Sequence, residues 1–406
     1  MIEPVGQGLP PGRIPLCTSP SSPDKQRNIF DNKQMSLTEK LSLFNSSFPI
    51  EEFQQVRSLP SICYLDNEIY EAESLGIFGG WVGAGCISDV ANPLDYFTQE
   101  ITGEPLVVLK DKNGTLKAFL NSCRHNGTML LTEPKGKLDD KLPCDYHDWG
   151  YKIAENTGDL CRAPKLGKVD WFCPKEYSLH PFEAATWGPL IFVRMEPGTD
   201  SLSTMLEPIK QWTADKDLSK FKWEYRWEDE VECNWKTYVE NFLDGGYHVK
   251  SIHRKLAQSL NLDKYCTEVS GHCNLQHTPM KNNANDPRQG SGAKYLWLSP
   301  NTMVNIYEDA MDTNIVLPLG PNKCKIIFDF FFTDGKKKSD KNKYITGAKQ
   351  VQLEDKRVCE RVMHGLKSRY YEPGPYAKPE IGKFHFRKIL AETFSRELGK
   401  FIYKSV

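Results

Sequence analysis

The stretch Cys123–His147, CRHNGTMLLTEPKGKLDDKLPCDYH, carries a cysteine and a histidine close together at each end. His125 follows Cys123 by two positions, and His147 follows Cys144 by three. Each pair stands near an expected turn, so two loops could hold one metal centre between them. The stretch therefore predicts a site built from two cysteines and two histidines.

Two metal centres take such a ligand set. Zinc would give a closed structural site, whereas a [2Fe–2S] cluster with two cysteines on one iron and two histidines on the other is a Rieske centre. Zinc fingers usually carry their histidines as a close pair on a helix, after a close pair of cysteines. Here each half contributes one cysteine and one histidine, so that each loop can provide a ligand to each iron. This order favours the Rieske cluster over zinc.

The surroundings of this stretch predict a small all-β domain over about residues 60–195. Short apolar segments such as Leu106–Lys110 and Leu116–Leu120 alternate with turns. Asn113-Gly114 between these two segments is a strong hairpin signal.

The second half of the chain mixes helices and strands and indicates an α+β domain. Lys236–Ile252 has a helical pattern apart from two glycines, and Val351–Ser368 has helical apolar spacing. Tyr295–Phe332 contains several apolar runs that suit an antiparallel sheet.

The first of these helical stretches contains His248 and His253, preceded by Glu240 and Asp244. Residues four apart share one face of a helix, so Glu240, Asp244 and His248 would form one polar stripe. Two neutral imidazoles plus a carboxylate from elsewhere make the facial triad of non-haem Fe(II) oxygenases. A histidine pair is a weak signal by itself, but beside the cysteine and histidine loops it indicates a second metal centre.

With both sites in view, the chain resembles the large (alpha) subunit of a Rieske-type non-haem iron oxygenase from about Pro49 to its C-terminus. The segments that carry the resemblance are Trp81, Ala118–His125, Tyr146–Trp149, Trp187-Gly188, Asn234–Lys236, Glu240-Asn241, Tyr247-His248 and His253. Within the family, Leu243–His248 and Glu354–Glu360 most resemble the choline monooxygenase branch. The resemblance implies an α+β protein: an N-terminal all-β Rieske [2Fe–2S] domain, then an α+β catalytic domain with an antiparallel sheet and a helix-borne mononuclear iron site. We expect a mobile tail over residues 1–36, the Rieske domain with a lead-in segment over 37–200, and the catalytic domain over 201–406.

The resemblance also implies the ligands of both centres. His248, His253 and Asp355 would hold the mononuclear Fe(II). Glu354 is the alternative carboxylate, because adjacent helix residues point about 100° apart and cannot serve equally. The ligands implied for the cluster are Cys123, His125, Cys144 and His147.

This chain departs from the family at three positions near these ligands, one of which is Asp145, where many relatives have proline. Gly245 stands where many ring-hydroxylating relatives carry an aspartate that bridges the two metal centres, so Asp244 or Glu240 would have to take that role. Asp148 stands where many relatives have glycine after the second ligand histidine.

The activity implied by the resemblance is hydroxylation of a small substrate with O2. The choline monooxygenase branch points to a quaternary ammonium compound, with choline converted to betaine aldehyde hydrate. N-demethylation of a betaine or carnitine, or hydroxylation of an arene, stays open. The chain has no flavin or nicotinamide fingerprint, so a separate ferredoxin or flavin reductase is expected, and the family implies a homotrimer. The rival from another class is a Rieske electron carrier or a zinc-stabilised binding module, which would need no facial triad.

A quaternary ammonium group binds over the faces of aromatic rings. The aromatic residues expected to line the substrate pocket lie in the predicted sheet of the second half: Tyr295, Trp297, Tyr307 and Phe328.

Composition narrows the possible binding partners and the possible location of the protein. The 406 residues include 52 basic and 53 acidic ones, a balance that gives no electrostatic case for nucleic acid or an anionic membrane surface. No apolar run approaches the ~20 residues of a membrane span. Twelve cysteines without framework spacing predict reduced thiols and a cytoplasmic location. Organellar targeting is possible, but acidic residues in the N-terminal tail do not favour a transit peptide.

Overall fold

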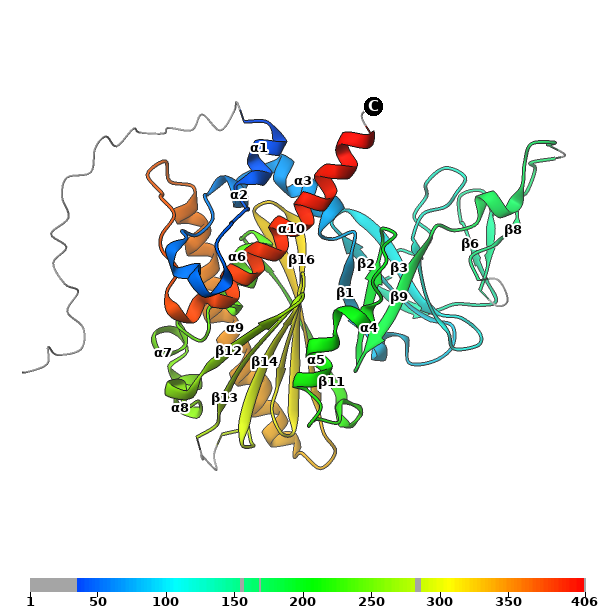
Figure 1. The fold of residues 1–406 in the computed structure, drawn as a ribbon. Helices are drawn as coiled ribbons and strands as arrows, with labels where there is room; N and C mark the ends of the chain where they lie inside the picture. Colours follow the sequence, from blue (N-terminus) through cyan, green and yellow to red (C-terminus); the bar gives the residue numbers. More distant parts are fainter. Residues whose placement is uncertain (1–34, 154–156, 168, 282–285, 405–406) are drawn as a thin grey trace, which may run out of the picture. The chain divides into compact units, whose positions relative to one another are not determined.

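The computed structural model describes residues 35–153, 157–167, 169–281 and 286–404 (Figure 1). The mobile tail expected for residues 1–36 lies outside the described residues, apart from Met35 and Ser36. No helix within the described ranges is long and apolar enough to cross a membrane.

The all-β part predicted around the cysteine and histidine loops is a seven-stranded antiparallel sheet. In spatial order its strands are β1 (Trp81–Cys86), β10 (Leu190–Arg194), β9 (Pro181–Trp187), β4 (Leu116–Leu120), β3 (Glu104–Lys110), β2 (Asp95–Ile101) and β5 (Lys135–Lys137). The expected hairpin joins β3 to β4, where the Asp111 carboxylate accepts the N–H groups of Asn113 and Thr115, each at 2.9 Å. A small second sheet consists of β6 (Lys141–Pro143), β7 (Gly150–Lys152) and β8 (Leu160–Arg162).

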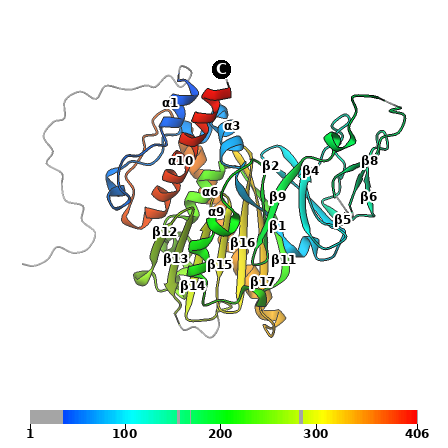
Figure 2. The same ribbon diagram turned by 45° about the vertical axis from the view of Figure 1, so that its right-hand side comes forward.

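A second seven-stranded antiparallel sheet forms the centre of the other half (Figure 2). Its spatial order is β11 (Lys222–Val231), β17 (Lys323–Phe332), β16 (Ala310–Gly320), β15 (Thr302–Ile306), β14 (Gly292–Leu298), β13 (Cys273–Pro279) and β12 (Cys266–Ser270). Strands β12 to β17 form a meander, in which each strand pairs with the next along the chain. This confirms the antiparallel sheet predicted from the apolar runs.

Helices pack on this second sheet and connect it to the lead-in segment. The α-helices are α1 (Leu37–Ser42), α2 (Ile62–Leu65), α3 (Asn67–Gly76), α4 (Leu202–Met205), α5 (Glu207–Trp212), α6 (Trp235–Phe242), α7 (Val249–Ile252), α8 (Arg254–Ser259), α9 (Lys338–Leu366) and α10 (Ile381–Lys404). Short 3-10 turns are η1 (Ile50–Gln55), η2 (Ile87–Val90), η3 (Pro174–Tyr177), η4 (Leu218–Lys220), η5 (Leu262–Lys264) and η6 (Lys378–Glu380). The Tyr344 ring of α9 contacts Phe330 and Phe332 of β17, whereas α10 contacts β12, α1 and α3.

The two sheets share one apolar cluster, to which strands of both halves contribute. At its edge Arg226 of β11 pairs with Asp89 of η2 at 2.6 Å and with Asp329 of β17 at 2.8 Å. Both carboxylates are almost completely buried, with side chains 4% and 0% exposed. A guanidinium that holds two buried carboxylates fixes the first sheet against the second. The predicted domain boundary near residue 200 falls between β10 and α4.

The polar stripe predicted within the helical pattern of Lys236–Ile252 is wrong. Helix α6 ends at Phe242 and α7 begins at Val249, so Glu240, Asp244 and His248 do not lie on one helical stripe. The glycines between them, Gly245 and Gly246, have φ of 69° and 74°, a left-handed conformation that glycine adopts without a steric penalty. A Cβ at position 245 would also lie 2.1 Å from the Pro379 carbonyl oxygen, so this backbone has no room for a side chain there.

Candidate active site

Two loops with the same backbone hydrogen bonds carry the predicted cluster ligands. The loop of Cys123 lies between β4 and β5, and the loop of Cys144 joins β6 to β7. In each loop the cysteine N–H donates to the carbonyl five residues on, and the cysteine carbonyl accepts from the N–H four residues on. The residues that donate to those carbonyls, Gly127 and Asp148, both have positive φ, 74° and 59°. Asp148 therefore occupies a left-handed position, which aspartate tolerates better than most residues, and its carboxylate pairs with Arg162.

The side chains of these loops separate into a buried sulfur side and an exposed imidazole side. Cys123 and Cys144 are 3% and 2% exposed. Burial raises the pKa of the Cys144 thiol, and a hydrogen bond with Cys123 adds to the rise. His125 and His147 are exposed, with ring centroids 4.7 Å apart, and His125 stacks on Trp149. Each loop thus supplies one sulfur and one imidazole.

This donor set fits a two-iron cluster better than a single zinc ion. Four ligand atoms on one tetrahedral zinc lie within about 4 Å of one another. Among the described residues, one group of three His, Cys, Asp or Glu side chains has its ligand atoms within 4.8 Å of one another. The cysteine and histidine side chains of the two loops do not form such a group. A [2Fe–2S] cluster binds two thiolates on one iron and two imidazoles on the other, so its four ligand atoms do not have to converge on one point.

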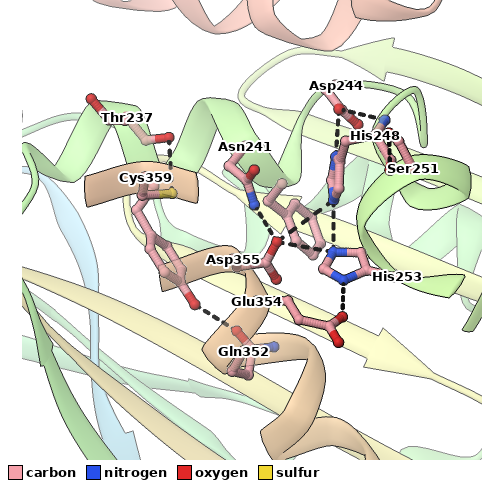
Figure 3. A network of polar contacts seen from close by, with 12 residues as sticks. Thr237, Asn241, Asp244, His248, Ser251, His253, Gln352, Glu354, Asp355 and Cys359 are labelled. Atoms are coloured by element: carbon pink, nitrogen blue, oxygen red, sulfur yellow. Dashed lines mark hydrogen bonds and ion pairs between the residues drawn. The ribbon is translucent and has the colours of Figure 1, made fainter. Parts of the chain in front are cut away.

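The place where three ligand atoms converge is formed by His248, His253 and Asp355 (Figure 3). The two histidines stand at the ends of α7, and Asp355 lies on α9. His248 Nε2 and His253 Nε2 lie 2.9 Å apart, and Asp355 Oδ1 is 3.6 Å and 3.0 Å from them. Two imidazole nitrogens and one carboxylate oxygen on one face match a facial triad, which suits Fe(II).

Each histidine of this triad is also held by a carboxylate of its own, on the ring nitrogen that faces away from Asp355. Asp244 Oδ2 lies 2.5 Å from His248 Nδ1, and Glu354 Oε2 lies 2.8 Å from His253 Nδ1. A proton held on Nδ1 leaves the Nε2 lone pair free for a metal. The four side chains are therefore arranged as two carboxylate–histidine pairs with both Nε2 atoms directed at one point.

The same geometry distinguishes the two neighbouring acids of α9. Asp355 Oδ1 faces both Nε2 atoms and accepts a hydrogen bond from Asn241 Nδ2 at 2.7 Å. Glu354 is bound to the far side of the His253 ring. Burial lowers the pKa of His253, but hydrogen bonds and the negative charges of Asp355 and Glu354 outweigh it and raise that pKa overall.

The two candidates for the bridging carboxylate have separate surroundings. Glu240 is half-buried and does not fit that role, because both its oxygens accept from the Tyr64 hydroxyl, at 2.9 and 2.8 Å. Because α6 ends at Phe242, Glu240 does not share a helical face with Asp244 and His248 as the prediction assumed. Asp244 instead contacts His248, and its other oxygen, Oδ1, is buried without a hydrogen-bond partner among the described residues.

A cavity of about 90 Å³ opens beside the triad. Besides the triad, its lining combines tyrosines with polar side chains of the second sheet and its connections: Tyr265, Tyr295, Tyr307, Gln276, Arg288, Asn305, Asp312 and Asn314. Three of the lining residues were not predicted from the sequence: Arg288, Asp312 and Tyr265. The sequence contains a signal for Asp312, because it is an acid inside the apolar run of β16. Such an acid is costly to bury without a partner, which indicates a polar site.

The structure brings two of the four residues expected in the aromatic cage to the cavity. Tyr295 and Tyr307 line the cavity, but Trp297 and Phe328 do not. Trp297 shares a face of β14 with Tyr295, yet there Phe386 of α10 packs against it, with ring centroids 5.3 Å apart. Phe328 lies on β17, where it stacks on Trp227 of the edge strand at 4.7 Å. Both rings are core residues.

Two protein families match the sequence of this chain. Residues 80–173 match the Rieske [2Fe-2S] domain, and residues 206–395 match the catalytic domain of the ring hydroxylating alpha subunit. The first match contains both cysteine and histidine loops, and the second contains the triad.

Similar proteins align with most of the length of this chain. Choline monooxygenase, chloroplastic, of Arabidopsis thaliana is 32% identical over 86% of this chain and 84% of its own length. The carnitine monooxygenase oxygenase subunit of Escherichia coli K12 is 28% identical over 84% of this chain and 95% of its own length. The crystal structure of the quaternary ammonium Rieske monooxygenase CntA in complex with substrate L-carnitine has a TM-score of 0.74 at 25% identity, over 86% of this chain and all (100%) of that chain.

Proposed function

The chain belongs to the Rieske-type non-haem iron oxygenases, and we propose that its substrate is a small quaternary ammonium compound. The reaction consumes one C–H bond, O2, two electrons and two protons, and yields the hydroxylated product and water. Choline is the substrate predicted from the sequence. Hydroxylation of an N-methyl group of a betaine or carnitine, followed by demethylation, is the second candidate, since the relatives named for these two activities match the chain over similar lengths.

The observation that carries the proposal is the convergence of His248, His253 and Asp355 beside a small tyrosine-lined cavity. When bound, the Rieske cluster supplies electrons and the mononuclear iron activates dioxygen. In this proposal Asp244 and Glu354 hold the two Nδ1 protons and keep both rings directed at the metal. The cavity tyrosines present ring faces to the cationic head group.

We assign the cluster to Cys123, His125, Cys144 and His147. Iron and sulfide analysis tests this assignment, with about three irons and about two acid-labile sulfides expected per chain. Cys123→Ser should abolish the visible cluster spectrum, whereas Cys161→Ser, which changes an exposed cysteine of β8, should keep it. Zinc without sulfide in the purified protein would overturn the assignment.

The substrate class is tested by turnover with choline, glycine betaine, L-carnitine and a simple arene, using a generic ferredoxin and reductase. Oxidation of a quaternary ammonium compound is expected, and it should be lost in His248→Ala while the cluster spectrum persists. His277→Ala is the control, because His277 is bound to Glu268 away from the triad. Oxidation of the arene alone would refute the proposed class.

Asp244 is our candidate for the residue that connects the triad to a cluster. Its Oδ1 is a buried acceptor without a donor among the described residues, and its Oδ2 already holds His248. In a homotrimer, which the family suggests, a cluster histidine of a neighbouring subunit could supply the missing donor. Asp244→Asn should slow cluster oxidation at least about 10-fold in a single turnover with O2 and substrate. An unchanged rate, as expected for the exposed control Asp263→Asn, would leave Asp244 with a structural role only.

The remaining partners and the location are part of the same proposal. A separate ferredoxin or flavin reductase supplies the electrons, because the chain has no nicotinamide or flavin fingerprint. The protein acts in the cytoplasm. Fractionation of native cells tests the location, and recovery of the chain in an organelle would correct it.

A further inference from the structure

Arg288 is a cationic side chain inside the cavity that the proposed chemistry does not use. It precedes β14, and its side chain is 10% exposed. The guanidinium carbon lies 5.9 Å from the centroid of the Tyr307 ring and 5.4 Å from that of Tyr344. It is the one Lys or Arg among the described residues that line the cavity.

The guanidinium lacks a hydrogen-bonded anion. Its Nε has no partner among the described residues. The nearest acid is Asp286, whose Oδ1 is 4.0 Å from an Arg288 terminal nitrogen, beyond hydrogen-bond distance. That oxygen accepts the Arg288 backbone N–H at 2.8 Å, and Oδ2 accepts the Ser259 hydroxyl. Asp312 also lines the cavity, but its two oxygens hold other donors.

A buried guanidinium whose Nε has no acceptor and whose nearest carboxylate lies 4.0 Å away is incompletely paired, and the anion that best matches it is a carboxylate. Taking one charge out of water without pairing costs several kcal/mol. The planar fork of arginine donors fits the two oxygens of a carboxylate, whereas an alcohol offers one oxygen and no charge. The position of Arg288 therefore favours a ligand that brings a carboxylate into the cavity.

An aromatic wall separates this guanidinium from the metal ligands. Tyr265 packs against Gly246, beside the triad, where an added Cβ would lie 2.9 Å from its ring. Tyr265 stacks on Tyr295 with ring centroids 6.2 Å apart, and the Tyr295 hydroxyl is 3.2 Å from that of Tyr307. A molecule that lies along this wall can place a methylated ammonium against the tyrosines and an anion on Arg288.

We propose that Arg288 binds the carboxylate of a zwitterionic substrate, so that the cavity selects a trimethylammonium carboxylate over the amino alcohol choline. This inference rests on the proposed oxidation of a quaternary ammonium compound and specifies its substrate class. Arg288 sets the orientation as well as the selectivity, because the carboxylate held there directs the N-methyl end toward the triad.

Binding without turnover tests the inference. Isothermal titration of the oxidised, iron-loaded protein with glycine betaine and choline compares two ligands that share the trimethylammonium group. The wild-type protein should bind glycine betaine more tightly. Arg288→Gln should weaken glycine betaine binding by roughly 30-fold or more, as expected for loss of a buried charge-assisted pair. Choline binding should change by less than about 3-fold.

Matched variants separate recognition from folding. Arg361→Gln changes an exposed arginine of α9 and should leave both affinities unchanged. Arg288→Lys keeps the charge without the planar fork and should give an intermediate loss for glycine betaine only. Equal affinity of the wild-type protein for both ligands, or an equal loss of both in Arg288→Gln, would overturn the inference and leave the proposed function intact. Binding of neither ligand by the wild-type protein would refute the proposed function itself.

Discussion

Replacement of Glu73 by glutamine should destabilise the protein through a buried ion pair that is not part of the metal sites. Lys236 Nζ lies 2.5 Å from Glu73 Oε1, and the two side chains are 0% and 1% exposed. Glu73 Oε2 accepts the Trp235 indole N–H at 2.7 Å. These contacts fasten the beginning of α6 to α3, and α6 leads directly into the turn that carries Asp244.

The expected magnitude follows from what each variant leaves behind. In Glu73→Gln the amide can still accept the indole N–H, but Lys236 stays buried without a counter-charge, which costs about 3–5 kcal/mol. The Tyr64 and Trp235 rings, 5.6 Å and 5.4 Å from the Lys236 Nζ, contact the ammonium in the wild type as well and therefore leave this difference unchanged. We expect a loss of about 3–5 kcal/mol. Glu73→Gln combined with Lys236→Met removes the stranded charge and should lie within about 1 kcal/mol of the wild type.

The assay is urea unfolding of the iron-loaded protein, followed by tryptophan fluorescence at one protein concentration. The single variant should lower the midpoint clearly, and the double variant should restore most of it. Glu71→Gln changes an exposed acid of the same helix and should stay within about 0.5 kcal/mol. A double variant as unstable as Glu73→Gln would refute the assignment of the loss to a stranded buried charge.

Three further predictions concern other parts of the chain. Asp355→Ala should lose the mononuclear iron, whereas Glu354→Gln should keep it with roughly 10- to 100-fold weaker binding; iron analysis that finds the reverse would exchange their roles. Burial lowers the pKa of His385 from 6.5 to about 4. The unfolded chain therefore binds this proton at a higher pH than the folded one, and stability should fall by about 3 kcal/mol as pH drops from 6.5 to 4; urea midpoints that fall as steeply in His385→Phe would contradict this. Burial raises the pKa of Cys273 to about 12, so iodoacetamide at pH 8 should spare it and modify the exposed Cys266, and mass spectrometry that finds native Cys273 alkylated would contradict the burial.

The sequence could predict what depends on residue type and local spacing. The antiparallel sheets follow from alternating apolar runs and turn signals, and the two cysteine and histidine pairs mark their loops directly. The assignment of Asp355 needed the family resemblance, because a carboxylate about one hundred residues from His253 has no local relation to it.

What failed depended on three-dimensional packing. Helical spacing suggested one helix through Asp244, but two adjacent left-handed glycines follow the end of α6, and the Pro379 carbonyl leaves no room for a side chain at position 245. Trp297 alternates correctly onto the pocket face of its strand and is nevertheless covered by α10. Arg288 lies in a loop without any pattern, so only the folded chain brings it into the cavity.

The tight approach of Gly245 to Pro379 also matters for searches of genomes by sequence motif. A pattern that demands an acid three residues before the first histidine would reject this chain, although Asp244, one position earlier, reaches the His248 ring. Gly245→Asp, made to imitate the acid of ring-hydroxylating relatives, would force a side chain against the Pro379 carbonyl oxygen. The variant would therefore not reproduce the position of that acid. For this chain, a search pattern or a library for directed evolution should therefore keep Asp244-Gly245-Gly246 as one unit and judge its acid by the contact with His248.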